Sequence, residues 1–125
     1  MLLNKAAMTF QEMVEEARKS VREMHARDIE ANMPDALYAD VREIEEWDEG
    51  HIPGAIHVPL SRLDSLADPN SSHAAAEITR HRDAPIVVYC ELGKRSLLAG
   101  KALQELGYCN VVSLKGGYHA WKMHR

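Results

Sequence analysis

The sequence predicts an α/β fold in which a mainly parallel sheet carries helices on both faces. Short apolar, β-branched runs alternate along the chain with segments of helical periodicity, which is the pattern of parallel strands joined by helices. The clearest pair is the strand pattern Ile86–Tyr89 and the helical pattern from about Ser96 to Leu106, where apolar residues recur every three or four positions. Gly107 is a natural end for that helix.

The other expected elements continue this alternation. Thr9-Phe10-Gln11-Glu12 is a capping box, which predicts a helix that begins there and runs to about Ser20. The elements expected after it are, in order, a short edge strand at Val21–Met24, a helical turn or two at His25–Asn32, a strand at Ala36–Val41, a helical turn within Arg42–Glu49, a short strand within Gly50–Pro59 with a type II turn at Pro53-Gly54, a short helix at Leu60–Leu66, a helix at Ala74–His81, a strand at Tyr108–Ser113 and a terminal helical turn at Tyr118–Met123.

The composition is that of a single globular domain. The 125 residues suit one hydrophobic core, and the contents of 46% hydrophobic and 27% charged residues are not those of a disordered chain. The formal net charge of -4 argues against nucleic-acid and anionic-membrane partners. The sequence has neither a bilayer-length apolar run nor a signal peptide. Its two cysteines are too few for a disulfide framework, so we expect a cytoplasmic protein.

Cys90 stands where the Ile86–Tyr89 strand pattern ends and a helix is about to begin. Open α/β sheets bind ligands at this edge, and a helix amino terminus flanked by Lys94 and Arg95 favours an ionised sulfur. Such a cysteine supports attack on a phosphoester or on the outer sulfur of a sulfane donor. A phosphate needs a longer loop closed by a bidentate arginine, whereas Arg95 lies five positions after Cys90. The plainer alternative is a buried core cysteine.

Other sites receive less support from the sequence. The seven histidines are scattered, and close-set pairs of metal ligands are absent, so we expect no metal and no cofactor. We expect Cys109 to fill space in the hydrophobic core. The alternative is a resolving thiol that reacts with Cys90.

Six segments taken together resemble the rhodanese-like single-domain sulfurtransferase family. They are Leu37–Glu43, Glu46-Trp47, Gly50–Ile56, Val87–Ser96, Gly107–Val111 and Leu114–Trp121, in this order and spacing. The resemblance implies a rhodanese fold with a five-stranded mainly parallel sheet over residues 21–125, and it leaves residues 1–20 as an amino-terminal helical extension. It also implies transfer of a sulfane sulfur from a donor such as thiosulfate to a thiophilic acceptor, through a persulfide on Cys90.

The resemblance assigns further roles by position. It implies that the backbone amides of Glu91, Leu92, Gly93, Lys94, Arg95 and Ser96 cradle the persulfide, and that Asp40, Arg42 and His51 support the site. The implied partners are a small anionic sulfur donor and a thiol acceptor, with a protein donor or acceptor as an alternative. Glu91 departs from the family, many members of which carry arginine there, and its carboxylate opposes an anionic donor. A persulfide carrier with little free turnover, and a rhodanese-like phosphatase or arsenate reductase, remain alternative functions.

Overall fold

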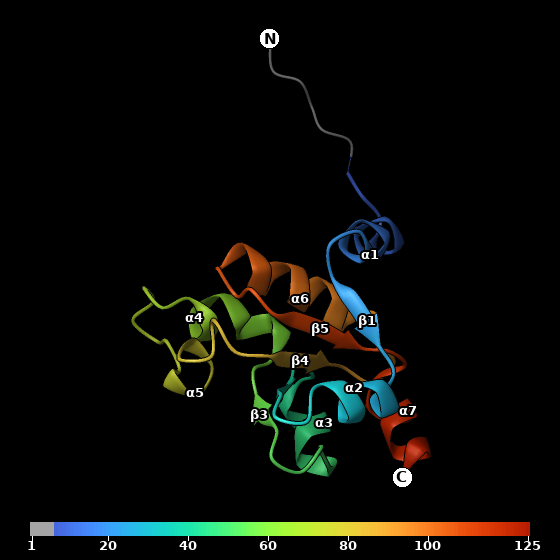
Figure 1. Cartoon of the computed structure of the whole chain (residues 1–125). Coiled ribbons are helices and arrows are strands. Elements are labelled where there is room, and N and C mark those ends of the chain that lie inside the picture. The colour runs from blue at the N-terminus through green and yellow to red at the C-terminus, as the bar shows by residue number, and fades with distance from the viewer. Residues whose placement is uncertain (1–6) are drawn as a thin grey trace.

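The computed structural model describes residues 7–125, which form a five-stranded sheet with helices on both faces (Figure 1). The strands are β1 (Arg22–Met24), β2 (Leu37–Asp40), β3 (Ile56–His57), β4 (Ile86–Tyr89) and β5 (Val111–Leu114). The helices are α1 (Phe10–Arg18), α2 (Ala26–Asn32), α3 (Ile44–Glu49), the 3-10 helix η1 (Leu60–Arg62), α4 (Leu63–Ala67), α5 (Ala76–Thr79), α6 (Arg95–Glu105) and α7 (Gly117–His124). The strand order is β1-β5-β4-β2-β3, and each neighbouring pair is parallel. The predicted α/β class is therefore confirmed.

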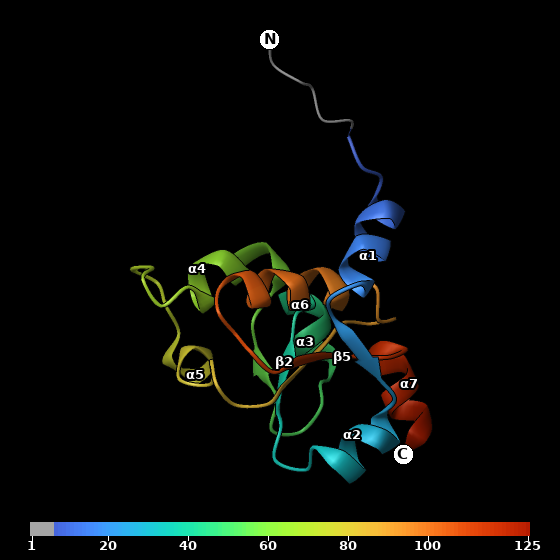
Figure 2. The ribbon, with the colours of Figure 1, turned by 45° about the horizontal axis from the view of Figure 1, so that its top comes forward.

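Strand β4 lies at the centre of the sheet and separates two hydrophobic cores. Its alternate side chains point to opposite faces, as the strand period requires. Ile86 and Val88 join the core beneath α4 and α6, and Val87 and Tyr89 join the core on the α2 and α7 side (Figures 1 and 2). Cys90 continues the first set and lies with Val88 in the core beneath α6.

The amino-terminal helix α1 is packed against α6. Val14, Ala17 and Val21 form a third small core with Leu97. Outside this core, the side-chain amide of Gln104 on α6 donates a hydrogen bond of 2.9 Å to the carbonyl of Ser20. Residues 1–6 of the predicted extension lie outside the described residues.

Two local sequence signals form the structures they predicted. The hydroxyl of Thr9 accepts a hydrogen bond from the amide of Glu12, and the Glu12 carboxylate accepts one from the amide of Thr9, so the capping box is confirmed. The type II turn is also present, because the Ala55 amide donates to the Ile52 carbonyl and Gly54 has a φ of +85°.

Strand β5 begins at Val111, three residues later than predicted. The reason is that two earlier backbone amides are bound outside the sheet. The amide of Tyr108 donates to the carbonyl of Leu103, and that of Cys109 donates to the carbonyl of Arg82. The sheet ladder therefore starts only after these residues.

The helices are short, and some end earlier than their patterns predicted. α5 spans Ala76–Thr79 instead of Ala74–His81. It starts later, where the amide of Ala75 donates to the carbonyl of Leu66, and it ends earlier, because the amide of His81 donates to the carbonyl of Ile78 three residues back and does not continue the α-helical pattern. α6, with 11 residues, is the longest in residues 7–125. None of the described helices has the length and apolar character needed to cross a bilayer.

Candidate active site

Cys90 follows the carboxyl end of the central strand, and its sulfur lies against the start of α6. The Sγ atom accepts hydrogen bonds from the backbone amides of Gly93, at 3.1 Å, and Ser96, at 3.3 Å. Ser96 lies in the first turn of α6, so the positive end of the helix dipole faces the sulfur. The cysteine is 4% exposed. This arrangement suits a sulfur that carries negative charge.

A buried pair of serines extends the hydrogen-bond network behind the sulfur. The Ser96 hydroxyl lies 3.4 Å from Sγ of Cys90 and 2.7 Å from the hydroxyl of Ser113, and both serines are fully buried. Ser113 lies on β5, which neighbours β4 in the sheet. The contact with Ser113 therefore fixes the position of the Ser96 hydroxyl that faces the sulfur.

The first turn of α7 holds the carbonyl side of the cysteine loop. The amide of Tyr118 donates to the carbonyl of Cys90 at 2.8 Å, and the amide of His119 donates to the carbonyl of Glu91 at 3.1 Å. Gly117 allows this approach: its φ is +65°, and a Cβ atom there would lie 2.5 Å from the Glu91 carbonyl oxygen. The start of α7 thus sets the orientation of the peptide planes that follow Cys90.

Arg42 connects the strand β2 to the cysteine loop. Its guanidinium forms a bidentate pair with the fully buried carboxylate of Asp40, in which Nη2 donates to Oδ2 at 2.8 Å and Nε donates to Oδ1 at 3.1 Å. The same side chain donates to the carbonyl of Gly50 at 2.7 Å and to the carboxylate of Glu91 at 3.2 Å. One buried cation therefore joins three segments around the loop.

The surroundings of Arg42 stabilise its charge. Burial alone would lower the pKa of this guanidinium, but the hydrogen bonds and charge of Asp40 outweigh burial and raise the pKa above its ordinary value. The ring of Tyr118 lies 4.4 Å from the guanidinium carbon and adds a cation–π contact. Arg42 is thus a fixed positive charge that pairs with Glu91 beside the cysteine.

The cysteine opens onto a pocket of about 360 Å³. The lining residues are Phe10, Glu46, Cys90, Glu91, Leu92, Lys94 and Arg95. Lys94 and Arg95 are both exposed, and neither side chain forms an ion pair within residues 7–125. An anion that enters the pocket therefore meets two cations that have no other partner in the described part of the chain.

His51 lies in the turn after α3. Its ring stacks on Trp47 with the centroids 3.4 Å apart, and its Nδ1 atom lies 3.0 Å from the Trp47 carbonyl oxygen. The structure therefore gives His51 a contact with α3, while the adjacent Gly50 makes the link to Arg42.

Cys109 lies at the opposite edge of the sheet from Cys90. It precedes β5, whereas Cys90 follows β4, and the register pairs Val88 with Ser113. At the rise of a strand this offset amounts to about 20 Å. A disulfide requires Cα atoms within about 7 Å, so a resolving role toward Cys90 of the same chain is ruled out. Cys109 is also exposed, so the expectation of core filler is wrong.

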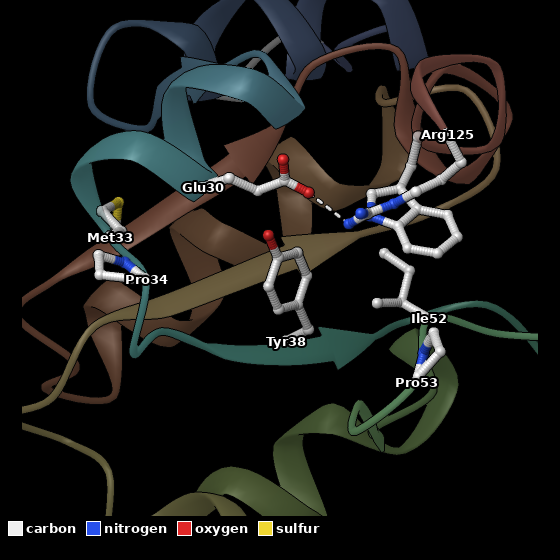
Figure 3. Close-up of a pocket in the computed structure, with 8 residues that line it drawn as sticks. Glu30, Met33, Pro34, Tyr38, Ile52, Pro53 and Arg125 are labelled. Atoms are coloured by element: carbon white, nitrogen blue, oxygen red, sulfur yellow. Dashed lines mark hydrogen bonds and ion pairs between the residues drawn. The ribbon is translucent and has the colours of Figure 1, made fainter.

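A larger hollow of about 520 Å³ lies on the α2 and α7 side (Figure 3). It is lined by Glu30, Met33, Pro34, Tyr38, Ile52, Pro53, Trp121 and Arg125, and the ion pair of Glu30 with Arg125 crosses part of its rim. These lining residues do not include any from the cysteine loop. Cys90, Lys94 and Arg95 line the smaller pocket.

Several residues around Cys90 are not predicted from the sequence to belong to the site. Phe10, Glu46 and Ser113 lie far from the loop in the chain, and no local spacing connects them to it. Gly117 belongs to the segment Leu114–Trp121 of the resemblance, which does not imply a contact with the cysteine loop. The Gly116-Gly117 pair before a helical pattern is the sequence signal for such a contact, because glycine accepts a positive φ and lets another backbone approach closely.

The fold and this loop define an α/β domain in which a cysteine follows the carboxyl end of the central strand of a parallel sheet. Residues 22–124 match the model of the rhodanese-like domain, and the chain belongs to this family. A human thiosulfate:glutathione sulfurtransferase is 37% identical over 86 residues, which are 66% of this chain and 75% of that protein. A thiosulfate sulfurtransferase from Coxiella burnetii is 31% identical over 90 residues, covering 72% of this chain and 75% of the relative.

One solved structure extends the similarity to the amino-terminal helix. It is a protein of unknown function from Rhodopseudomonas palustris, described as a possible tyrosine phosphatase. It aligns with a TM-score of 0.85 at 27% identity and covers 99% of this chain and 96% of its own. The helix α1 is therefore part of an arrangement that another solved protein shares.

Proposed function

We propose that this protein is a sulfurtransferase that moves a sulfane sulfur from a donor such as thiosulfate to a thiol through a persulfide on Cys90. The observation that carries the proposal is the position of Sγ, which accepts hydrogen bonds from two backbone amides near the start of α6. The sulfur faces a pocket lined by Lys94 and Arg95, which form no ion pair within residues 7–125. The names of the two relatives support the same reaction class.

In the first step, the Cys90 thiolate attacks the outer sulfur of thiosulfate. A bond forms between Sγ and that sulfur, and the bond between the two thiosulfate sulfurs breaks. Its electron pair leaves with sulfite. The amides of Gly93 and Ser96 and the dipole of α6 stabilise negative charge as it moves along the sulfur chain.

In the second step, an acceptor thiolate attacks the outer sulfur of the persulfide. The Cys90 sulfur takes the electron pair of the breaking bond and is restored as a thiolate, and the acceptor leaves as a persulfide. Because the sulfite departs before the acceptor enters, the cycle is of the ping-pong type.

A cysteine phosphatase is the competing function, since the similar solved protein from Rhodopseudomonas palustris is described as a possible tyrosine phosphatase. Both reactions use a cysteine in an anion-binding loop. The distinction is the size of the loop, because a phosphoryl group presents three non-bridging oxygens that need donors. Arg95 follows Cys90 by five positions and Ser96 starts the helical amides that reach Sγ, a compact ring that favours one sulfur atom.

Intact-mass spectrometry combined with turnover assays tests the proposal. After incubation with thiosulfate and removal of the excess, we expect the protein to gain the mass of one sulfur atom and to lose it on addition of glutathione or cyanide. Thiosulfate should also support multiple turnovers. A stable sulfur adduct without turnover would contradict the enzyme and indicate a persulfide carrier. Hydrolysis of a phosphoester without any sulfur adduct would favour the phosphatase.

The charge of Glu91 gives a second prediction. We expect Glu91→Gln to lower the KM for thiosulfate by about two- to fivefold at low salt, because a carboxylate beside the sulfur repels the donor and its pairing with Arg42 offsets this only in part. Glutamine is preferable to arginine here, since a second guanidinium would face Arg42. Steady-state kinetics at two ionic strengths measure the effect, which should shrink with added salt.

The matched control is Glu45→Gln, which removes the same charge from an exposed position on α3 that does not line the pocket. Its KM should stay within about twofold of the wild-type value. Equal changes in both variants would mean that overall charge, and not the site, determines donor binding.

A further inference from the structure

Phe10 places an aromatic side chain at the mouth of the cysteine pocket. It comes from α1, outside residues 22–124 that match the family model, and it is 48% exposed although it is large and apolar. Leu92, on the cysteine loop, lines the same pocket and is 66% exposed. We propose that Phe10 and Leu92 form an apolar wall that selects sulfur donors carrying a large apolar group, such as an aryl group, over small donors such as thiosulfate. The inference rests on the proposed sulfur transfer and deepens it.

The position of Phe10 is fixed by the structure around it. Phe10 is the first residue of α1 and lies inside the capping box, between Thr9 and Glu12. The same helix buries Val14 and Ala17 against α6. A side chain held on a packed and capped helix needs little ordering when a ligand binds, which favours recognition.

The pocket is suited to an organic ligand. Its volume of about 360 Å³ lies within the range of roughly 300–1,000 Å³ typical of sites for organic ligands. An inorganic donor would be held by the loop amides and the nearby cations, and would make little use of Phe10. An apolar substituent on the donor would bury surface of both Phe10 and Leu92 that is otherwise exposed to water.

The charges around this wall fit a donor with an anionic head. Lys94 and Arg95 line the pocket without an ion pair in the described part of the chain, while the Glu91 carboxylate is bound by Arg42. The combination of these two cations, an apolar wall and a sulfur nucleophile matches an organic thiosulfonate whose anionic sulfur head carries a large apolar group, such as an aryl group.

The reaction with a thiosulfonate forms and breaks the same kinds of bond as the reaction with thiosulfate. The Cys90 thiolate attacks the terminal sulfur, and a new bond forms between Sγ and that sulfur. The bond from the terminal sulfur to the sulfonyl sulfur breaks, and its electron pair leaves with the sulfonyl group as a sulfinate. No proton is gained or lost, and Cys90 holds the same persulfide as before.

Two thiosulfonates with the same reacting sulfur head but apolar groups of different size distinguish the effect of the apolar wall from the effect of the sulfur-transfer chemistry. The value of kcat/KM is measured for benzenethiosulfonate and methanethiosulfonate, with glutathione as the acceptor, in the wild type and in Phe10→Ala. We expect the variant to lose about tenfold with the benzene donor and to stay within about twofold with the methane donor. An unchanged ratio of the two values, or an equal loss with both, would overturn the inference.

Met13→Ala is the matched control, because Met13 lies on the same helix and is 42% exposed but lines a different hollow, together with Met8 and Leu98. The ratio of its kcat/KM values for the two donors should equal that of the wild type, and an equal shift of this ratio in both variants would overturn the inference.

The test also distinguishes failure of the selectivity from failure of the proposed sulfur transfer. If methanethiosulfonate supports turnover but Phe10→Ala leaves the ratio unchanged, only the selectivity fails. If thiosulfate loads the wild type with a persulfide but neither organic donor does, only the inference fails. If thiosulfate and both organic donors all leave the wild type without a persulfide, sulfur transfer itself is wrong and the inference fails with it.

Discussion

Cys90→Ser is expected to lower thiosulfate:cyanide turnover by about a thousandfold or more, while the protein remains folded. Serine retains an acceptor for the amides of Gly93 and Ser96, so the loop keeps its hydrogen bonds. Its hydroxyl is a much weaker nucleophile than a thiolate, and removal of a nucleophile from a site of this kind has effects of this size. Initial rates, intact mass after thiosulfate and thermal unfolding measure the three consequences.

Cys109→Ser is the matched control, because Cys109 is exposed at the opposite edge of the sheet. It should retain the wild-type rate and gain one sulfur on incubation with thiosulfate. If Cys90→Ser kept a rate within tenfold of the wild type, the persulfide scheme would be wrong. A sulfur adduct that disappeared in Cys109→Ser instead would assign the chemistry to the other thiol.

The parts of the site that the sequence predicts are those encoded by local patterns. The buried run Ile86–Tyr89 and the helical period after Ser96 place Cys90 at a strand-to-helix junction, and the structure has this junction. The capping box and the Pro53-Gly54 turn are local in the same sense. Each depends on backbone preferences within a few residues, which the amino-acid order specifies directly.

The contacts that complete the site depend on strand order, which no local period encodes. Ser113 reaches Ser96 because β5 lies beside β4, and the Arg42–Glu91 ion pair exists because β2 lies on the other side. The placement of Phe10 depends in turn on the packing of α1 against α6. The sequence predicts the nucleophile and its loop, whereas the residues that surround them are brought there by the tertiary structure.

The buried pair of Asp40 and Arg42 leads to the largest expected effect on stability. Asp40→Asn should lower the free energy of unfolding by about 3 kcal/mol, because it leaves the charge of Arg42 buried without its main partner. Glu91 remains as a second carboxylate, but its side chain is 41% exposed and compensates only in part. Urea unfolding followed by fluorescence or circular dichroism measures the change, with the m-value as a check on two-state behaviour.

Asp35→Asn provides the comparison, since Asp35 is exposed just before the same strand and its substitution should change the free energy of unfolding by no more than about 0.5 kcal/mol. A loss below about 1 kcal/mol in Asp40→Asn would show that the ion pair contributes little to the stability of the fold.

The folded fraction of Asp40→Asn should also bind thiosulfate less well. The loss of Asp40 frees Arg42 from the position in which it holds both the Gly50 carbonyl and Glu91, so the loop around Cys90 loses one of its supports.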